Sequence, residues 1–260
     1  MKRVLIIGGN SYIGKQFYKY IKENKVREMD IFLVSASDGT WEDVDFSEYD
    51  TVLHLAAIVH KKEKKNMKEL YFRVNHRLAI NIAQKAKEKG VKQFIFMSTA
   101  AIYGKLSGCI TKDTLPNPNT YYGMSKLAAE KDLIKLQDNR FSVVIVRPPM
   151  VYGEGCKGNY QKLIKLAKYM LLFPDYHNSR SILHINNLNR YLEVIIINEL
   201  GDYHYPQDME YADTCKMVVD IRKIDGKNTY LTRFFNKLIP ILIKRVEIFN
   251  KIFGDFYYKL

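Results

Sequence analysis

The sequence predicts an α/β fold, in which a doubly wound parallel sheet is followed by a smaller C-terminal region. Residues 4–14 read as four apolar positions, a pair of glycines and the start of a helical pattern. Up to Pro149, short apolar segments alternate with amphipathic ones, as in parallel strands joined by helices. The chain has 260 residues, of which 47% are hydrophobic, and this fits one large domain or a domain with a smaller appendage.

The glycine turn within residues 4–14 is suited to binding a phosphate group. Gly8 and Gly9 permit a tight turn, and Ile13 and Gly14 open a helix that we expect to end near Lys22. Such a turn directs backbone N–H groups and the positive end of a helix dipole toward one point, where a dinucleotide pyrophosphate can bind. Glycine after a strand is also common in plain turns, so this stretch alone does not establish nucleotide binding.

Four further strands and two long helices are expected before Pro149. The strands cover residues 30–34, 50–57, 93–97 and 142–146, and the helices cover residues 67–89 and 121–138. In the first helix apolar residues recur at every fourth position and predict one buried face, formed by Leu70, Val74, Leu78, Ile82 and Ala86.

Beyond Pro149 the alternation loosens. We expect helices over residues 160–172, 188–200 and 213–224, with short strands at 181–185 and 202–205. The predicted division is therefore a sheet domain over residues 1–149 and a smaller region over residues 150–260 that covers the ligand crevice.

Composition and charge exclude several classes of protein. The net charge is +13, and the densest basic cluster lies at residues 60–65, but no nucleic-acid motif accompanies it. We therefore read the charge first as a solvated face and next as attraction for a phosphate-bearing substrate, and we expect no nucleic-acid partner. The three cysteines form no C-x-x-C pair and the six histidines show no metal spacing, so we predict no disulfide framework and no metal.

Targeting signals are not evident in the sequence. No apolar run approaches the ~20 residues of a transmembrane helix, and the first apolar run stops at Gly8 without a cleavage site. These observations predict a cytoplasmic protein.

Polar residues that could carry chemistry follow the fourth strand and open the next helix. Ser98 and Thr99 come directly after the strand, at the sheet edge that binds ligands in parallel α/β folds. Tyr122 and Lys126 are four residues apart, so they share one face of a helix.

Together these features resemble the extended short-chain dehydrogenase/reductases, the NAD-dependent epimerase/dehydratase family that acts on nucleotide sugars. The resemblance covers at least residues 2–188 and includes the segments 53–57, 99–104, 122–126, 147–153 and 180–184. The sequence is most similar to short members from capsule and O-antigen gene clusters, which resemble 4-keto-sugar reductases and 4-epimerases. The resemblance implies a Rossmann-like sheet, NAD or NADP as cofactor, a UDP-linked nucleoside diphosphate sugar as substrate, and a homodimer formed by the helices at 67–89 and 121–138.

The resemblance also implies roles for individual residues. Thr99, Tyr122 and Lys126 would form the catalytic triad. Substrate contacts would come from Thr99, Ala100, Tyr122, Asn159, Lys162 and Arg180. Cofactor contacts would come from Gly8, Asn10, Ser11, Tyr12, Ile13, Gly14, Asp38, Leu55, Ala56, Ala57, Asn75, Ser98, Tyr122, Lys126 and Pro148.

The triad has a chemical rationale. A free tyrosine has a pKa near ~10 and is a poor base at neutral pH, but Lys126 and a positively charged nicotinamide would stabilise its phenolate. Tyr122 would then exchange a proton with a sugar oxygen while hydride passes between the sugar carbon and the nicotinamide, and Thr99 would hold the same oxygen.

Three positions depart from the family pattern. Ser11 stands where the family usually has its middle glycine, so the backbone would approach the pyrophosphate less closely. Asp38 comes late after the second strand and has no lysine or arginine beside it, which leaves NAD or NADP open. Met150 stands where many 4-epimerases have an Asn that meets the sugar diphosphate, so the phosphate contacts are assigned instead to Asn159, Lys162 and Arg180.

The resemblance allows three reactions, and a non-enzymatic role is the alternative to all of them. The 4,6-dehydratases place Asp-Glu after the catalytic hydroxyl residue, whereas Ala100 and Ala101 stand here, so we set dehydration aside. Met150 and the capsule-cluster resemblance favour reduction of a UDP-linked 4-keto-6-deoxy-amino sugar in surface polysaccharide synthesis, with UDP-sugar 4-epimerisation as the alternative. A non-catalytic nucleotide-binding protein is a second class of function, and the intact triad counts against it.

The C-terminal stretch 234–253 is rich in Phe, Leu, Ile and Lys and could bind a membrane surface. Because Pro240 interrupts it, we expect its apolar residues to pack on the substrate region and do not expect membrane association. The chain ends at Leu260, earlier than the relatives it resembles, which leaves open a substrate region truncated at its C-terminus.

Overall fold

A computed structural model describes residues 1–59 and 63–259 of the chain. Its largest element is a six-stranded parallel sheet with the strand order β10-β6-β4-β3-β1-β2. The six strands are β1 (Lys2–Ile7), β2 (Met29–Val34), β3 (Thr51–His54), β4 (Gln93–Met97), β6 (Ser142–Val146) and β10 (Asp202–His204). His60, Lys61 and Lys62 of the basic cluster lie outside the described residues.

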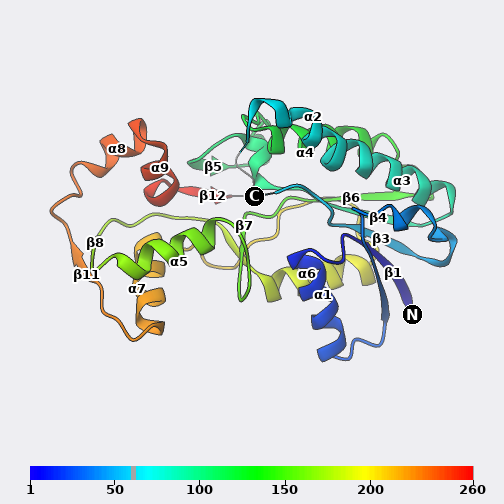
Figure 1. Ribbon diagram of the computed structural model, residues 1–260, viewed down its shortest axis with the longest axis horizontal. Helices are drawn as coiled ribbons and strands as arrows, with labels where there is room; N and C mark the ends of the chain where they lie inside the picture. Colours follow the sequence, from blue (N-terminus) through cyan, green and yellow to red (C-terminus); the bar gives the residue numbers. More distant parts are fainter. Residues whose placement is uncertain (60–62, 260) are drawn as a thin grey trace. The chain divides into compact units, whose positions relative to one another are not determined.

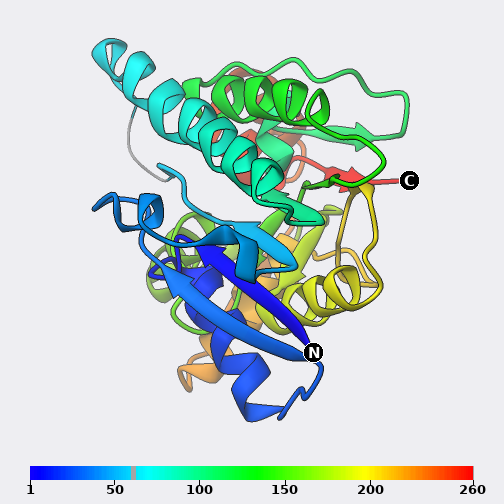
Figure 2. The same cartoon turned by 90° about the vertical axis from the view of Figure 1, so that its right-hand side faces the viewer.

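Helices cover both faces of this sheet. Figure 1 shows α2 (Lys68–Phe72), α3 (Leu78–Glu88) and α4 (Tyr121–Ile134) on one face, and α1 (Tyr12–Glu23) and α6 (Ile185–Ile197) on the other. Figure 2 shows the same two helix layers from the side. Short 3₁₀ turns lie in the connections at Thr40–Glu42, Phe46–Glu48, Lys65–Met67 and Ala100–Tyr103. The predicted α/β fold with a doubly wound parallel sheet is confirmed.

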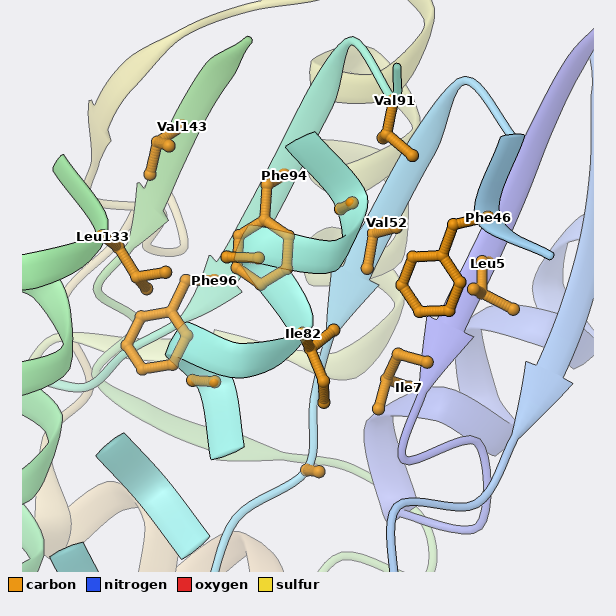
Figure 3. Close-up of a cluster of buried hydrophobic side chains, with 14 of the residues drawn as sticks. Leu5, Ile7, Phe46, Val52, Ile82, Val91, Phe94, Phe96, Leu133 and Val143 are labelled. Atoms are coloured by element: carbon orange, nitrogen blue, oxygen red, sulfur yellow. The ribbon is translucent and has the colours of Figure 1, made fainter. Parts of the chain in front are cut away.

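The core on the α3 and α4 side is built from alternate strand residues (Figure 3). Alternate residues of a strand point to the same face, so each strand contributes a short series of large apolar side chains. The helices contribute mainly alanine at the contact, which lets their backbones lie close to the sheet. The strand members are Leu5, Ile7, Val52, Phe94, Phe96, Val143 and Ile145, and the helix members are Ala79, Ile82, Ala83, Ala86, Ala129 and Leu133.

The long helix predicted over residues 67–89 is interrupted. A π-helical segment, Arg73–Arg77, separates α2 from α3. A π turn holds an extra residue, and the buried positions up to the start of α3 are displaced by one from the predicted face. Ile82 and Ala86 are buried as predicted, whereas the earlier part of the helix buries Tyr71, Asn75 and Ala79 in place of Leu70, Val74 and Leu78.

The contacts between residues divide the chain into two units. Unit 1 comprises Met1–Gly104, Pro116–Pro149 and His184–Pro206, and unit 2 comprises Lys105–Leu115, Met150–Leu183 and Gln207–Leu260. The linear division expected from the sequence differs from these units, because residues 105–115 belong to unit 2 and residues 184–206 belong to unit 1, although one segment of unit 2 begins at Met150. Residues 184–206 return to unit 1 because β10 extends the large sheet, with Tyr203 paired to Ile145 of β6.

Within the described residues, unit 2 contains four helices and three two-stranded sheets. Its own apolar core includes Phe173, Val218, Ile239 and Phe253. Pro240 does not interrupt a helix as expected, because it lies in the first turn of α8, where its missing N–H costs no helical hydrogen bond. The elements are β5 (Gly108–Ile110), β7 (Met150–Tyr152), α5 (Asn159–Tyr169), β8 (Leu172–Pro174), β9 (Ile182–His184), α7 (Thr214–Ile224), β11 (Tyr230–Thr232), α8 (Ile239–Arg245), α9 (Glu247–Phe253) and β12 (Phe256–Tyr258).

None of the helices found in residues 1–59 and 63–259 is both long enough and apolar enough to cross a bilayer.

Phe94 provides a test of the sheet core, because its side chain is fully buried and its ring lies 6.0 Å from the His54 ring. Phe94→Ala should lower the free energy of unfolding by about 3–5 kcal/mol, through lost burial and the cavity left behind. Urea denaturation measures this loss. Leu115→Ala, at a position that is 82% exposed, is the matched control and should cost less than about 0.5 kcal/mol. Equal losses in the two variants would contradict this packing.

Candidate active site

The turn after β1 holds glycines where a side chain would not fit. Gly8 has a φ of +92°, and a Cβ built on it would lie 2.7 Å from the backbone nitrogen of Ala56. A Cβ on Gly14 would lie 3.0 Å from the carbonyl oxygens of Gly8 and Gly9. Glycine at these positions therefore lets the first turn of α1 lie directly against the ends of β1 and β3.

Ser11, in place of the expected middle glycine, caps α1. Its Oγ accepts a hydrogen bond of 3.1 Å from the Gly14 N–H, and its backbone is in the extended region that any residue adopts. The N–H of Ile13 has no acceptor among residues 1–59 and 63–259, so it is available to an anion at the helix start. The turn therefore fits a dinucleotide pyrophosphate, and Ser11 does not prevent it.

The segment after β2 carries negative charge. Residues 35–44 contain Asp38, Glu42 and Asp43 and no lysine or arginine. The exposed Asp38 carboxylate accepts hydrogen bonds from Thr40, at 2.8 Å from Oγ1 and 3.1 Å from the backbone nitrogen. These bonds hold the pKa of Asp38 below its usual range, so the carboxylate is ionised at neutral pH.

The three residues predicted to be catalytic meet at the carboxyl end of β4. Thr99 follows the strand with an extended backbone, and its side chain is hydrogen-bonded to the Tyr122 hydroxyl. Lys126 lies one turn after Tyr122 on α4 and donates a hydrogen bond of 2.7 Å to the carbonyl of Met97. Its Nζ also lies 4.2 Å from the centre of the Phe96 ring. The end of β4 thus holds Thr99 at the Tyr122 hydroxyl and fixes the side chain of Lys126.

The start of α4 is fixed by two caps. Thr120 is the N-cap residue, and its Oγ1 accepts from the Gly123 N–H at 3.0 Å. The Glu63 carboxylate accepts from the backbone N–H groups of Tyr121 and Tyr122, each at 2.9 Å. A negative charge at a helix N-terminus is stabilising, so Glu63 anchors the backbone of Tyr122.

The carbonyl of Tyr122 is held as well. The Ser125 hydroxyl donates to it at 2.9 Å and accepts from the Asn75 Nδ2 at 3.1 Å. The Asn75 carboxamide also bonds both backbone groups of Ile58, at 2.7 Å and 3.2 Å. Asn75, predicted to contact the cofactor, therefore links the segment after β3 to the backbone of α4.

A buried ion pair lies one turn beyond Lys126. Glu130 is 1% exposed, and its carboxylate accepts hydrogen bonds of 3.2 Å and 2.7 Å from the guanidinium of Arg147, which follows β6. The Ser98 hydroxyl donates to the same carboxylate. Arg147 also donates to the hydroxyls of Tyr103 and Tyr205, at 3.1 Å and 3.2 Å. Because every partner is buried or half-buried, this network joins α4 to the ends of β4 and β6.

Burial sets the protonation of the predicted catalytic groups and of Arg147 in the chain without cofactor. It raises the pKa of Tyr122 to about 12, although the hydrogen bond with Thr99 opposes this rise. It lowers the pKa of Lys126 to about 7, opposed by the charge of Glu130. Burial also works against the charge of Arg147, but the Glu130 carboxylate outweighs it and holds the pKa of Arg147 above its usual value. Tyr122 is therefore a neutral phenol, and Lys126 titrates near neutral pH.

The remaining predicted site residues fall in both units. Leu55, Ala56, Ala100 and Pro148 are buried in unit 1, where the Ala100 N–H donates to the Pro148 carbonyl at 3.0 Å. Asn159 and Lys162 lie exposed on the first turn of α5 in unit 2. The half-buried Arg180, also in unit 2, donates to the carbonyl of Gly254 at 2.6 Å.

One further cluster of polar groups stands out among the described residues. The ligand-type atoms of Asp175, His177 and Cys215 lie within 4.8 Å of one another. The His177 ring nitrogens lie 3.1 Å from the Asp175 carboxylate and 2.6 Å from the Asp213 carboxylate, and Arg233 forms an ion pair with Asp175 at 2.8 Å. Burial raises the pKa of the Cys215 thiol to about 11, so the thiol is protonated at neutral pH.

Comparison with known protein families agrees with this geometry. Residues 4–198 match the NAD dependent epimerase/dehydratase family. The chain belongs to this family. It is an NAD(P)-dependent nucleotide-sugar epimerase or reductase of the extended short-chain dehydrogenase/reductases, as the sequence predicted.

Individual relatives include both kinds of enzyme. A UDP-glucose 4-epimerase from Vibrio cholerae is 30% identical over 97% of this chain and 83% of its own length. Among solved structures, UDP-glucuronic acid 4-epimerase from Bacillus cereus in complex with NAD has a TM-score of 0.70 at 22% identity, and the match covers 89% of this chain and 87% of that one. The dTDP-4-dehydrorhamnose reductase from Bacillus anthracis in complex with NADP has a TM-score of 0.71 at 21% identity, over 91% and 85% of the two chains.

Two acidic residues that fix α4 in the structure, Glu63 and Glu130, were not identified from the sequence. Glu130 could have been found, because it lies four residues after Lys126 and so shares the helix face of the triad. Glu63 carried no such signal, since it stands among lysines in a loop far from Tyr122 in sequence.

The shifted pKa of Lys126 predicts a pH-dependent stability difference. Between about pH 7 and about pH 10.5 the unfolded chain binds a proton that the folded chain does not, so stability rises with pH across this range. Lys126→Met removes this effect. We therefore expect the difference in free energy of unfolding, variant minus wild type, to fall as pH rises. Urea denaturation without cofactor measures this difference.

Lys131→Met, at an exposed position of the same helix, is the matched control and should show no such trend. A difference between Lys126→Met and wild type that stays constant with pH would contradict a buried Lys126 whose pKa is lowered.

Proposed function

We propose that this enzyme uses NAD to epimerise a UDP-linked sugar at C4. The observation that carries the proposal is the negative charge after β2. NADP has a phosphate on its adenosine ribose that needs a cationic partner there, whereas NAD has a hydroxyl that an acidic residue can hold. Asp38, Glu42 and Asp43 supply only negative charge in residues 35–44. This arrangement favours NAD, the cofactor suited to an enzyme that oxidises and re-reduces its substrate without net turnover of cofactor.

The Vibrio cholerae relative supports the choice of reaction and nucleotide. It is a UDP-glucose 4-epimerase and matches 97% of this chain at 30% identity. Met150 stands at the position of the Asn expected in many 4-epimerases, so the diphosphate contacts must differ in part. We assign them to Asn159 and Lys162, whose polar ends are exposed on one turn of α5, and to Arg180.

The chain's residues perform the proton transfer. Tyr122 accepts the proton of the C4 hydroxyl as the C4–H bond breaks, and returns it when hydride is added to the opposite face of the 4-keto sugar. Thr99 donates a hydrogen bond to the C4 oxygen and keeps it beside the phenol. Lys126, fixed by the Met97 carbonyl one turn after Tyr122 on α4, would in its protonated form stabilise the phenolate. Bound NAD supplies the hydride acceptor and donor.

Reduction of a 4-keto sugar, favoured by the sequence alone, is the second candidate. Met150 favours it, because the substrate contact expected in many epimerases is missing. The two candidates differ in stoichiometry. Purified protein with NAD and UDP-glucose should yield the C4 epimer without net change of nicotinamide absorbance. Steady consumption of NADH or NADPH with a UDP-linked 4-keto sugar, without epimer formation, would instead establish the reductase.

Tyr122→Phe tests the role of the phenol. This variant should lower kcat by about 10²- to 10⁴-fold, because proton transfer to the C4 oxygen is lost. Epimer formation followed by chromatography measures kcat, and fluorescence titration checks that NAD still binds. Tyr121→Phe removes the neighbouring hydroxyl and should leave kcat nearly unchanged. Wild-type turnover by Tyr122→Phe would show that another group moves the proton.

A further inference from the structure

Residues 233–245 of unit 2, which we call the basic apolar segment, expose large hydrophobic side chains. The segment runs from the end of β11 through a turn into α8. Phe234 is 84% exposed, Leu238 is 53% exposed and Ile241 is 50% exposed. Leu238 and Ile241 are three positions apart at the start of α8, which places them on one side of this helix, and Phe234 lies in the turn that precedes it.

The opposite side of the same segment is packed. Ile239 is 1% exposed and, together with the half-buried Ile243, joins the core of unit 2 that includes Phe253 of α9. Figure 1 shows α8 and α9 as neighbouring helices. One apolar side of the segment therefore packs against the core of unit 2. Its other apolar side chains are exposed to solvent.

Positive charge surrounds the exposed side chains. Lys237, Lys244 and Arg245 are exposed, as is Arg233, which pairs with Asp175 at 2.8 Å. Residues 233–245 contain no acidic residue. A surface with apolar side chains among basic ones is suited to the boundary of an anionic lipid bilayer, where the apolar groups enter the acyl layer and the cations meet headgroup phosphates.

We propose that the basic apolar segment docks this enzyme on an anionic membrane surface. A second copy of the chain is a poorer occupant, because a symmetric contact would place the same cluster of four cations against itself. The sequence led us to expect that the apolar residues of 234–253 would all pack on the protein. The structure shows that only one side does, since a helical segment divides its apolar residues between two sides.

Vesicle flotation of the full-length protein tests the proposal. Vesicles of phosphatidylcholine with phosphatidylglycerol should carry roughly tenfold more protein than vesicles of phosphatidylcholine alone, and high salt should reduce this binding. Phe234→Ser with Ile241→Ser, and separately Lys237→Glu with Lys244→Glu, should each remove most of the binding. Leu115→Ser with Met209→Ser removes two other highly exposed apolar side chains and should leave binding unchanged.

Three results would overturn the proposal. The first is equal recovery of the wild-type protein with anionic and neutral vesicles. The second is equal loss of binding in the Leu115→Ser/Met209→Ser control. The third is a wild-type dimer that the Phe234→Ser/Ile241→Ser variant converts to monomer in sedimentation equilibrium, because the exposed side would then be an interface between copies.

Discussion

The attachment of α4 to the carboxyl ends of β4 and β6 is the constraint on which the active site depends. Lys126 donates to the Met97 carbonyl, and one turn later Glu130 accepts from Ser98 and Arg147. A buried ion pair of this kind requires complete hydrogen bonding, since a lone buried charge is strongly destabilising. The helix therefore has one favourable position against the sheet, and this position brings Tyr122 to Thr99.

Much of this arrangement could be predicted from residue spacing. Parallel strands present their carboxyl ends at one edge, so hydroxyl residues after residues 93–97 were expected near the ligand. Spacing by four placed Tyr122 and Lys126 on one helix face. The glycine turn after β1 could also be predicted. The structure gives its reason, because a side chain at Gly8 or Gly14 would collide with backbone atoms.

Other features depend on contacts between residues far apart in the sequence. The π-helical segment at Arg73–Arg77 accommodates Asn75, whose partners Ile58 and Ser125 have no sequence signal that links them to it. Glu63 accepts hydrogen bonds from the first N–H groups of α4. In the sequence it stands among lysines, where a glutamate is expected to be an ordinary solvated residue. Residues 184–206 belong to unit 1 because β10 pairs with β6. Hydrophobic periodicity cannot predict which strands pair. Local pattern thus predicted most of the elements and the shared helix face of Tyr122 and Lys126, while the residues that fix this helix against the sheet were found only in the structure.

The most direct measurement concerns the protonation of Tyr122. Burial, opposed by the hydrogen bond with Thr99, raises its pKa to about 12, yet the proposed proton transfer at neutral pH requires a phenolate stabilised by Lys126 and by the positive charge of bound NAD. Ultraviolet difference titration of wild type against Tyr122→Phe reports this phenolate. With NAD bound, the difference spectrum should show ionisation near neutral pH, far below the value without cofactor. A phenol that remains protonated up to about pH 12 with NAD bound would contradict Tyr122 as the proton-transferring group.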